Sequence, residues 1–598
     1  MATATATRVA LCLALFTGLA EAALLGAAKI GLDRYVHRDP QVVWMAPLSN
    51  AVLFVVLLLP LALILRGRGE RSAVRISATA FGFLSVWALL QLSTRLHPGA
   101  GIVLAVGVAW QAGRLAGDRA PLVSKVARRA LIPLVALVVV AGLGLNARWA
   151  LAERGALASL PAAPAGAPNV LLIILDTVRS ASMSLYGYER PTTPRITQFA
   201  ARGATFDRAV SPAPWTLPAH ASLFTGRWAH ELSTGWKSPL DGETPTLAEA
   251  LTRGGYRTGG FVANYTYTSR ESGLARGFAR YEDYRVTPAH ALRNSALGQM
   301  VFGRALLRGV LGHRDVIARK MAPVLARDVL RWHDEEPGRP WFAFLNFFDA
   351  HDPYLPPAPY DTMFARRGAP RNLTLANERP VTPEEARPER DVYDGAIAYL
   401  DAELGAMLDS LRARGVLDNT VVIITSDHGE EFGENGLLGH GNSLYYPALW
   451  VPLVIVYPRV VPAGVRVPNA VSTRDISATV LQLTGAASPR MPGRSLARFW
   501  GEGGGRAGGD PALDPATADT VLSMVQHATN LPAWFPVSDG TMHSLVAGMS
   551  HLIRDGKGRL SLYDVAEDPD ARTDLAADSA GRARARRLDE ALKALTAQ

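Results

Sequence analysis

The sequence predicts an α/β three-layer sandwich preceded by an α-helical membrane domain of about five spans. Three observations lead to this prediction. Five apolar stretches fill residues 8–150, and short apolar runs alternate with helix-like segments after residue 168. Polar side chains of metal-ligand types directly follow several of those runs. With 598 residues, 48% hydrophobic and 19% charged, the chain is longer than one ordinary domain and too apolar for a disordered protein.

The apolar stretches are the candidate membrane spans, and they cover residues 9–32, 51–65, 76–92, 99–112 and 130–145. A helix needs about 20 apolar residues to cross a bilayer. The first, third and fifth stretches meet this need, the second does so when residues 48–51 are added, and the fourth is short and glycine-rich. The first stretch alone also resembles a cleaved signal peptide, since Arg8 precedes it and Ala20-Glu21-Ala22 resembles a cleavage site. The spans that follow at once favour a retained helix.

Charge between the spans predicts their orientation. The loop of residues 66–75 carries four arginines against one glutamate, a net +3, and the loop of residues 114–129 carries a net +4. Basic loops stay cytoplasmic, so we expect a cytoplasmic N-terminus and a fifth span that leads outward. Because these loops hold +7 of the net +9, the charge predicts topology in a lipid bilayer and no nucleic-acid partner.

The domain boundaries follow from composition. We expect a membrane domain at residues 1–150, an Ala/Pro/Gly-rich linker at 151–168 and a catalytic domain at 169–598, periplasmic or extracellular on the cytoplasmic membrane. Residues 289–326 form a basic, apolar insert that either lies on the membrane or packs on its own domain. The single cysteine, Cys12, leaves no intramolecular disulfide and no Cys-rich zinc site.

The soluble part contains four apolar runs that are typical of strands buried on both faces. They lie at residues 169–175, 341–348, 420–425 and 451–457, with helix-like segments at 246–253 and 391–412. Asp176 follows the first run, His351 lies shortly after the second, and Asp427 and His428 follow the third. Ligands bind beyond the carboxyl ends of strands in open α/β sheets, so this pattern predicts a metal centre there.

A fourth segment supplies a candidate nucleophile. In residues 214–227, Pro218 suits a first helical turn and Gly226 a helix end, so Thr216 should project from the helix N-terminus. The helix field contributes only about 0.3–1 kcal/mol, which cannot ionise a threonine. A divalent metal lowers the pKa of bound water to about 7. Thr216 must therefore touch the metal if it is to attack.

These motifs resemble those of the sulfatase family, within the alkaline phosphatase superfamily. The similar segments are NVLLIILDTVR, PWTLPAHASLFTGR, FLNFFDAHDPYLPP, TSDHGEEFGENGLLGHGNSLY and LIRDGKGRLSLYDVAEDPDARTDLA. The resemblance implies an alkaline phosphatase/sulfatase-like sandwich. It also implies metal ligands at four positions, and groups that contact or protonate the ester at three more. The ligands would be Asp176, Thr216, Asp427 and His428, and the other groups His351, His440 and His220, of which His220 could donate to the nucleophile or to the ester.

Three departures from the family pattern bear on the reaction. Thr216 replaces the usual Cys or Ser, so we expect no formylglycine. Thr177 stands where a second aspartate is usual, and His428 where many sulfatases have asparagine. Two carboxylates, an alkoxide and an imidazole favour one Zn²⁺ or Mn²⁺ ion over Ca²⁺ or Mg²⁺.

The sequence therefore predicts a membrane-anchored, metal-dependent hydrolase of a sulfate or phosphate ester, carried on a glycan or a lipid. A threonine nucleophile also resembles phosphoethanolamine transferases and lipoteichoic acid synthase, so transfer to an envelope lipid or glycan is one alternative. A catalytically inactive membrane receptor or scaffold is the other.

Overall fold

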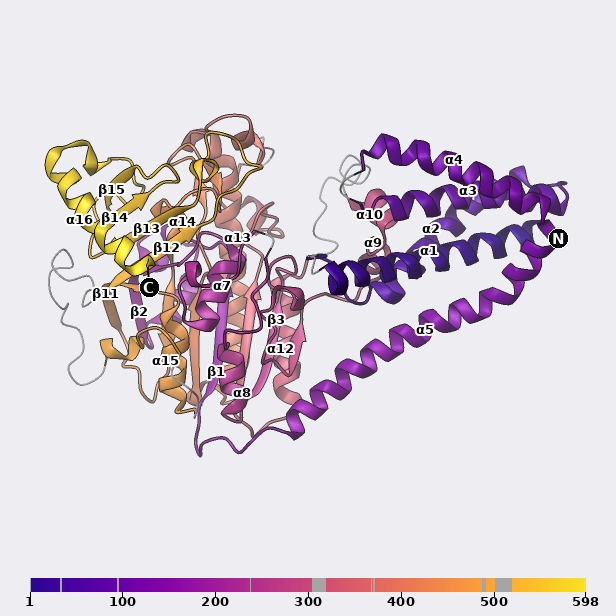
Figure 1. Ribbon diagram of the computed structural model, residues 1–598. Coiled ribbons are helices and arrows are strands. Elements are labelled where there is room, and N and C mark those ends of the chain that lie inside the picture. Colours follow the sequence, from indigo (N-terminus) through magenta and orange to yellow (C-terminus); the bar gives the residue numbers. More distant parts are fainter. Residues whose placement is uncertain are drawn as a thin grey trace. The chain divides into compact units, whose positions relative to one another are not determined.

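The computed structural model describes residues 2–597, apart from 33–34, 94–95, 237, 304–318, 367, 369–370, 487–490 and 501–518. The chain divides into two compact units (Figure 1). One unit comprises Met1–Gly155 with Tyr284–Arg319, and the other comprises Ala156–Asp283 with Lys320–Gln598. Each unit has its own apolar core.

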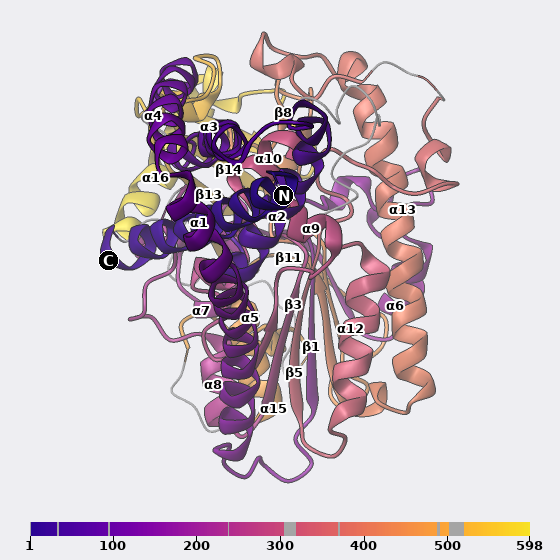
Figure 2. The same ribbon diagram turned by 90° about the vertical axis from the view of Figure 1, so that its right-hand side faces the viewer.

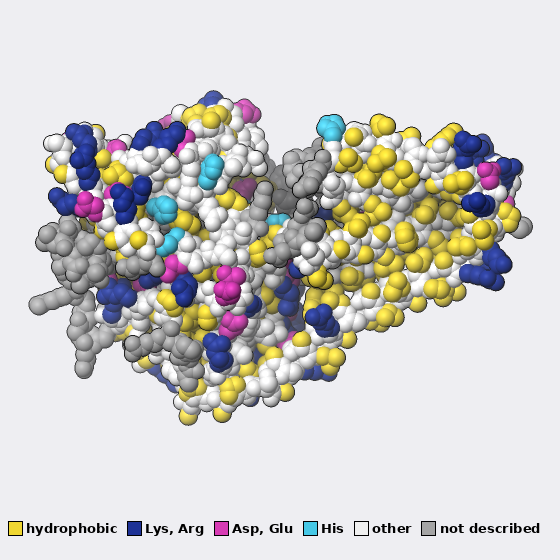
Figure 3. All heavy atoms as spheres, in the orientation of Figure 1, with side chains coloured by type: hydrophobic (Ala, Val, Ile, Leu, Met, Phe, Trp, Pro, Cys, Tyr) yellow, Lys and Arg dark blue, Asp and Glu magenta, His cyan; other side chains and the backbone are white. Residues whose placement is uncertain are grey.

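The N-terminal unit begins with five long helices, α1 (Ala2–Leu32), α2 (Val42–Ile64), α3 (Glu70–Leu90), α4 (Pro98–Asp118) and α5 (Ala120–Ala158). All five are long and apolar enough to cross a membrane. Hydrophobic side chains cover their sides, whereas Lys and Arg gather at one end (Figure 3). At that end Arg71 pairs with Asp118 at 2.5 Å, which joins the basic α2–α3 and α4–α5 connections. Helix α5 continues through residues 151–158, where the sequence predicts a linker.

The main sheet of the second unit has nine strands in the order β11-β2-β10-β6-β1-β5-β3-β4, with β9 beside β2. Their bounds are β1 Asn169–Leu175, β2 Ala204–Val210, β3 Arg257–Val262, β4 Arg280–Glu282, β5 Trp341–Phe347, β6 Thr420–Thr425, β9 Trp450–Val451, β10 Leu453–Val456 and β11 Val465–Ser472. Strand β1 is parallel to both β5 and β6, and β3 is parallel to β5. These four strands therefore end at the same edge of the sheet.

Helices cover both faces of this sheet, and Figure 2 shows the strands between them. Along β1, Leu171, Ile173 and Leu175 face one apolar core and the alternate residues face the other. The first core includes α6 (Pro194–Ala200), α12 (Ala322–Glu335) and α13 (Pro383–Ala413); the second includes α7 (Thr216–Thr225), α8 (Leu247–Arg253) and α15 (Asp475–Thr484). The predicted three-layer α/β sandwich is confirmed.

The fourth predicted strand differs from its neighbours in direction. Strand β10 runs antiparallel to β6 and to β2. Between β6 and β10 the chain forms only the hairpin of β7 (Glu431–Phe432) with β8 (Leu438–Gly439), the short helix α14 (Tyr446–Leu449) and the two-residue strand β9. No long helix takes the chain to the opposite edge, so β10 starts where β6 ends and must run back.

A second sheet of four antiparallel strands follows, in the order β12 (Thr520–Val525), β13 (Met542–Ala547), β14 (Ser550–Arg554) and β15 (Leu560–Asp564). Helix α16 (Ser579–Thr596) packs on it through Leu588 and Leu592. Strands β14 and β15 overlap the late segment that resembles the C-terminal part of the family, and this sheet adds no candidate site residue.

Candidate active site

The polar side chains at the shared edge of the main sheet come from four neighbouring strands and one helix. Asp176 directly follows β1, and Asp427 and His428 follow β6 after one serine. Asn264 lies two residues after β3. Helix α7 follows β2 at the same edge and begins at Thr216. The topology therefore brings together the four residues that the sequence predicted as metal ligands.

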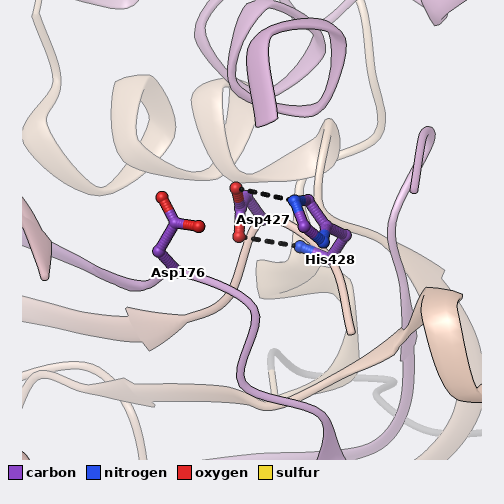
Figure 4. A group of neighbouring side chains, drawn as sticks. All are labelled: Asp176, Asp427 and His428. Atoms are coloured by element: carbon purple, nitrogen blue, oxygen red, sulfur yellow. Dashed lines mark hydrogen bonds and ion pairs between the residues drawn. The ribbon is translucent and has the colours of Figure 1, made fainter. Parts of the chain in front are cut away.

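Asp176, Asp427 and His428 form the core of the site. All three are buried, and their candidate ligand atoms lie within 4.8 Å of one another. Figure 4 shows the three side chains next to one another, with Asp427 between Asp176 and His428. A cation between two buried carboxylates this close together would offset their desolvation and their mutual repulsion.

The Asp176 carboxylate uses its two oxygens differently. Oδ2 accepts hydrogen bonds from the amide groups of Asn264 and Asn346, both at 3.0 Å. Oδ1 is buried and has no hydrogen-bond donor among the described residues. An unpaired buried carboxylate oxygen is costly, so this atom is suited to a cation.

The Asp427 carboxylate has the same division. Oδ1 accepts the backbone N–H groups of Thr177 at 3.2 Å and His428 at 2.9 Å. Oδ2 is buried without a hydrogen-bond donor among the described residues and lies 3.4 Å from His428 Nε2. Each aspartate therefore keeps one unsatisfied oxygen within a group of three candidate ligands, which fits a bound divalent metal.

His428 is prepared to act as a neutral ligand. Its Nδ1–H donates to the Gly429 carbonyl at 3.0 Å, which leaves the lone pair on Nε2. Burial, together with the neighbouring His440, lowers the pKa of His428 to about 3. The imidazole is thus uncharged at neutral pH, as metal ligation requires.

Thr216 lies against this group. Its Oγ1 is 3.3 Å from His428 Nε2, and the Asn264 amide donates to it at 3.5 Å. The same amide also bonds Asp176, so Asn264 links the hydroxyl to the first carboxylate. The hydroxyl is buried at the first residue of α7, as the sequence predicted.

His220, which the sequence predicts to donate to the nucleophile or to the ester, uses one ring nitrogen within the protein. Its Nδ1–H donates to the Thr216 carbonyl at 2.8 Å and lies 3.6 Å from Asp427 Oδ2. Its Nε2 is buried without a hydrogen-bond partner among the described residues, and the ring packs edge-on against Phe344 at 5.8 Å. His220 braces the first turn of α7.

His351 and His440 lie beside one another with opposite charge preferences. Their ring centroids are 5.0 Å apart, and those of His440 and His428 are 4.5 Å apart. Burial alone would lower the pKa of His351, but the Asp352 carboxylate at 2.7 Å raises it to about 9. Burial, with cationic His351 nearby, lowers the pKa of His440 to about 4. One ring is therefore charged and the other neutral at pH 7.

Thr177 occupies the position after Asp176 at which the family usually has a second aspartate. It has φ +63°, an unfavourable left-handed conformation for a β-branched residue. Its hydroxyl donates to the Ala350 carbonyl at 3.1 Å, while its N–H bonds Asp427. The backbone of Thr177 thus supports a carboxylate, and its side chain supplies no ligand to the group.

Sequence reasoning missed three contributors. Asn346 lies inside the apolar run of residues 341–348, where a lone polar residue in a buried strand is itself a signal. Asn264 lies just beyond β3, in a segment that showed no ligand cluster. Glu430 is buried and its Oε1 pairs with His440 Nδ1 at 2.9 Å, and burial raises the pKa of Glu430 to about 8. This pairing leaves His440 Nε2 as its other ring nitrogen for the site.

Comparisons with known proteins agree with this architecture. The sequence profile of the family described as Sulfatase matches residues 168–486. A choline-sulfatase of Rhizobium meliloti is 26% identical over 360 residues, which cover 54% of this chain and 68% of that protein. Arylsulfatase K of Canis lupus familiaris is 26% identical over 394 residues, which cover 58% and 70%.

Solved structures share the fold of the second unit. The phosphonate monoester hydrolase of Agrobacterium radiobacter superposes with a TM-score of 0.56 at 25% identity, covering 72% of this chain and 96% of that one. The family match includes β1, α7 and β6, the elements that carry Asp176, Thr216, Asp427 and His428. The chain belongs to the sulfatase family, as a hydrolase of sulfuric or phosphoric esters.

Proposed function

We propose that Thr216 is the nucleophile that attacks the ester of this hydrolase. A divalent cation beside it would be held by Asp176, Asp427, His428 and the Thr216 hydroxyl. The observation that carries the proposal is the pair of buried carboxylates, Asp176 and Asp427, each with one unpaired oxygen and with candidate ligand atoms within 4.8 Å of each other and of the His428 imidazole. The hydroxyl oxygen of Thr216, the predicted nucleophile, lies 3.3 Å from His428 Nε2.

The donor set favours Zn²⁺ or Mn²⁺. The set has only four ligand atoms, and it mixes two carboxylate oxygens and a hydroxyl oxygen with an imidazole nitrogen. Ca²⁺ instead takes six to eight oxygen ligands. When bound, the cation would lower the pKa of the threonine hydroxyl and offset the negative charge of the ester.

The chain's own residues would carry the bond changes. The Thr216 oxygen forms a bond to sulfur or phosphorus, and the bond from that atom to the leaving oxygen breaks. We assign neutral His440 as acceptor of the threonine proton and protonated His351 as donor to the leaving oxygen. A formylglycine hydrate carries two hydroxyls on one carbon and can expel the bound group by reforming its aldehyde, whereas threonine carries only one. Water must therefore attack the sulfur or phosphorus of the threonine ester, which releases sulfate or phosphate and restores the Thr216 hydroxyl.

Trapping the covalent intermediate tests this proposal. Purified protein is mixed with an aryl sulfate or an aryl phosphate, quenched in acid within one turnover and digested. Mass spectrometry should find the sulfo or phospho group on the peptide that contains Thr216. Product release with no adduct on that peptide at any quench time would contradict a threonine nucleophile. The hydrolase names of the relatives give no support to the transferase alternative.

The five apolar helices support a membrane anchor, and their charge pattern supports a domain outside the cytoplasmic membrane. The basic α2–α3 and α4–α5 connections share one end of the bundle, so α5 would leave the membrane at the other. Protease added to intact spheroplasts should then degrade the domain that starts at residue 169. Protection until the membrane is opened would contradict this orientation.

The charge states of the two histidines predict the pH dependence of the reaction. The rate constant kcat/KM should fall as the pH rises through about 9, because His351 then loses its proton. Replacing Asp352 with asparagine removes the carboxylate that keeps His351 charged. The alkaline limb should therefore shift to lower pH, since burial alone lowers the pKa.

A matched control uses another histidine–aspartate pair. His333 Nδ1 lies 3.0 Å from the exposed Asp334 carboxylate, and both residues belong to α12, which supplies no residue to the site. Asp334→Asn should leave the profile unchanged. An Asp352→Asn profile that coincides with the wild-type profile would exclude His351 as the acid.

A further inference from the structure

Residues 284–303 belong to the sequence of the catalytic domain, between β4 and α12, yet they pack with the N-terminal helices. They form α9 (Pro288–Arg293) and α10 (Ala296–Gly303), which lie beside α2, and α10 also contacts α3 (Figures 1 and 2). The sequence left open whether this region lies on the membrane or packs on its own domain. Residues 304–318 of the predicted insert lie outside the described residues.

The segment is part of the apolar core of the helical unit. Ala296 and Leu297 are buried in the same cluster as Phe54 and Phe81. At Gly298, an added Cβ would come within 2.8 Å of Ser49 Oγ and 1.9 Å of the Leu292 carbonyl oxygen. A glycine at this position allows α10 to approach α2 closely.

A buried carboxylate joins the segment to α1. Glu21 is 1% exposed, and its Oε1 accepts a hydrogen bond from Asn50 of α2 at 2.9 Å. Its Oε2 accepts the backbone N–H of Ala296 at 2.8 Å. A carboxylate inside a membrane helix is expensive and usually functional. Here half of its hydrogen bonding comes from α10.

Three further polar contacts hold the same segment. Ser49 donates to the Leu292 carbonyl at 2.6 Å and its hydroxyl lies 2.8 Å from that of Ser295. His290 Nε2 lies 3.0 Å from the buried Asp39 carboxylate, just before α2. Without the segment, the polar groups of α1 and α2 would lose these partners in an apolar surrounding.

The docked segment also sits at one end of the bundle. Glu21 lies in the second half of α1, and Ser49 and Asn50 lie in the first half of α2. Both places lie in the half of these helices nearer to the α1–α2 connection, away from the basic connections. This is the end where the proposed orientation puts the catalytic domain.

We propose that residues 284–303 are a docking segment that fastens the catalytic domain to the outer end of the helix bundle, and that this attachment directs hydrolysis to esters carried at the membrane surface. The proposal rests on the proposed hydrolase function and orientation. Only residues 283–287 connect β4 to α9, and five residues span at most about 18 Å when extended. With the segment docked, the domain is held near the bilayer by this connection as well as by the linker after α5. The tether raises the local concentration of the active site at the surface.

A cysteine pair tests whether the segment is docked in the full-length protein in membranes. Cys12 is the only native cysteine, so a Cys12→Ala background leaves no competing thiol. Ser49→Cys with Ser295→Cys should form a disulfide under mild oxidation. Alkylation in denaturant without reductant, followed by mass spectrometry, should then add no tags. Each single variant is the control and should take one tag, and two tags on the pair would overturn docking.

Activity tests the consequence. The protein is reconstituted in phosphatidylcholine vesicles with an aryl ester attached to a diacylglycerol anchor, or with the same ester free in solution. Glu21→Leu should slow hydrolysis of the anchored ester about tenfold and leave that of the soluble ester unchanged. Glu21→Gln is the matched variant, since its amide can still accept from Ala296 and pair with Asn50, and it should retain both activities.

A rescue separates docking from misfolding. In the Glu21→Leu protein, the oxidised Ser49→Cys/Ser295→Cys disulfide should restore the anchored-ester rate, and reduction should remove it again. Equal loss of both activities without rescue, or unchanged ratios in Glu21→Leu, would overturn the docking role. A wild-type protein that hydrolyses neither ester would instead contradict the proposed hydrolase function.

Discussion

Replacing Thr216 with alanine should lower kcat for ester hydrolysis by at least about 10³-fold, because loss of a nucleophile costs far more than loss of a binding contact. Bound metal should persist, since Asp176, Asp427 and His428 remain. Steady-state kinetics on an aryl ester, with metal content measured on the same sample, separate these two effects. Thr216→Ser keeps the hydroxyl and should retain a large part of the activity.

Thr225 provides the matched control within the same helix. It ends α7, is equally buried, and donates its hydroxyl to the Ala221 carbonyl at 2.7 Å. Thr225→Ala makes the same chemical change away from the site and should affect stability more than kcat. A Thr216→Ala protein that binds metal and keeps wild-type kcat would show that water or another group attacks the ester.

Replacing Asp427 with asparagine should weaken metal binding by more than about 100-fold and abolish activity, because it removes one of the two unpaired carboxylate oxygens. The effect on stability should change sign with metal. Without metal, the variant should melt at a higher temperature than the wild type, since Asp176 and Asp427 no longer repel each other within the same buried group. With excess Zn²⁺ or Mn²⁺, only the wild type should be stabilised. Thermal melts with and without metal measure both.

Asp401→Asn is the control for this experiment. Asp401 is also buried, but it accepts the backbone N–H groups of Arg195 and Ile196 at 2.9 and 2.8 Å, away from the site. Its replacement should lower the melting temperature and leave the metal-induced shift intact. A metal-induced shift of wild-type size in Asp427→Asn would place the cation elsewhere.

Much of the catalytic domain could be predicted from local patterns. The apolar runs of β1, β5 and β6 specify strands buried on both faces, while Pro218 lies in the first turn of α7 and Gly226 caps its C-terminus. Ligand-type residues directly after such strands share one edge when the strands are parallel. For that reason the sequence predicts that Asp176, Asp427 and His428 lie at one edge, and the structure brings them together beside Thr216.

Other features depend on residues far apart in the chain, and no local pattern encodes them. Asn264 is 88 residues from the carboxylate that it bonds, and Glu21 is 275 residues from the N–H of Ala296.

The sequence by itself determined the order of the two domains, the strands that end at the site and the residue types that meet there, because hydrophobic periodicity and helix or strand ends are local properties. Only the tertiary structure decided which oxygen of each aspartate is left unpaired, the direction of β10, and the attachment of residues 284–303 to α1 and α2. Those features are set by packing and hydrogen bonding across distant segments, where many partners are compatible with one sequence pattern and a single arrangement satisfies all the buried polar groups together.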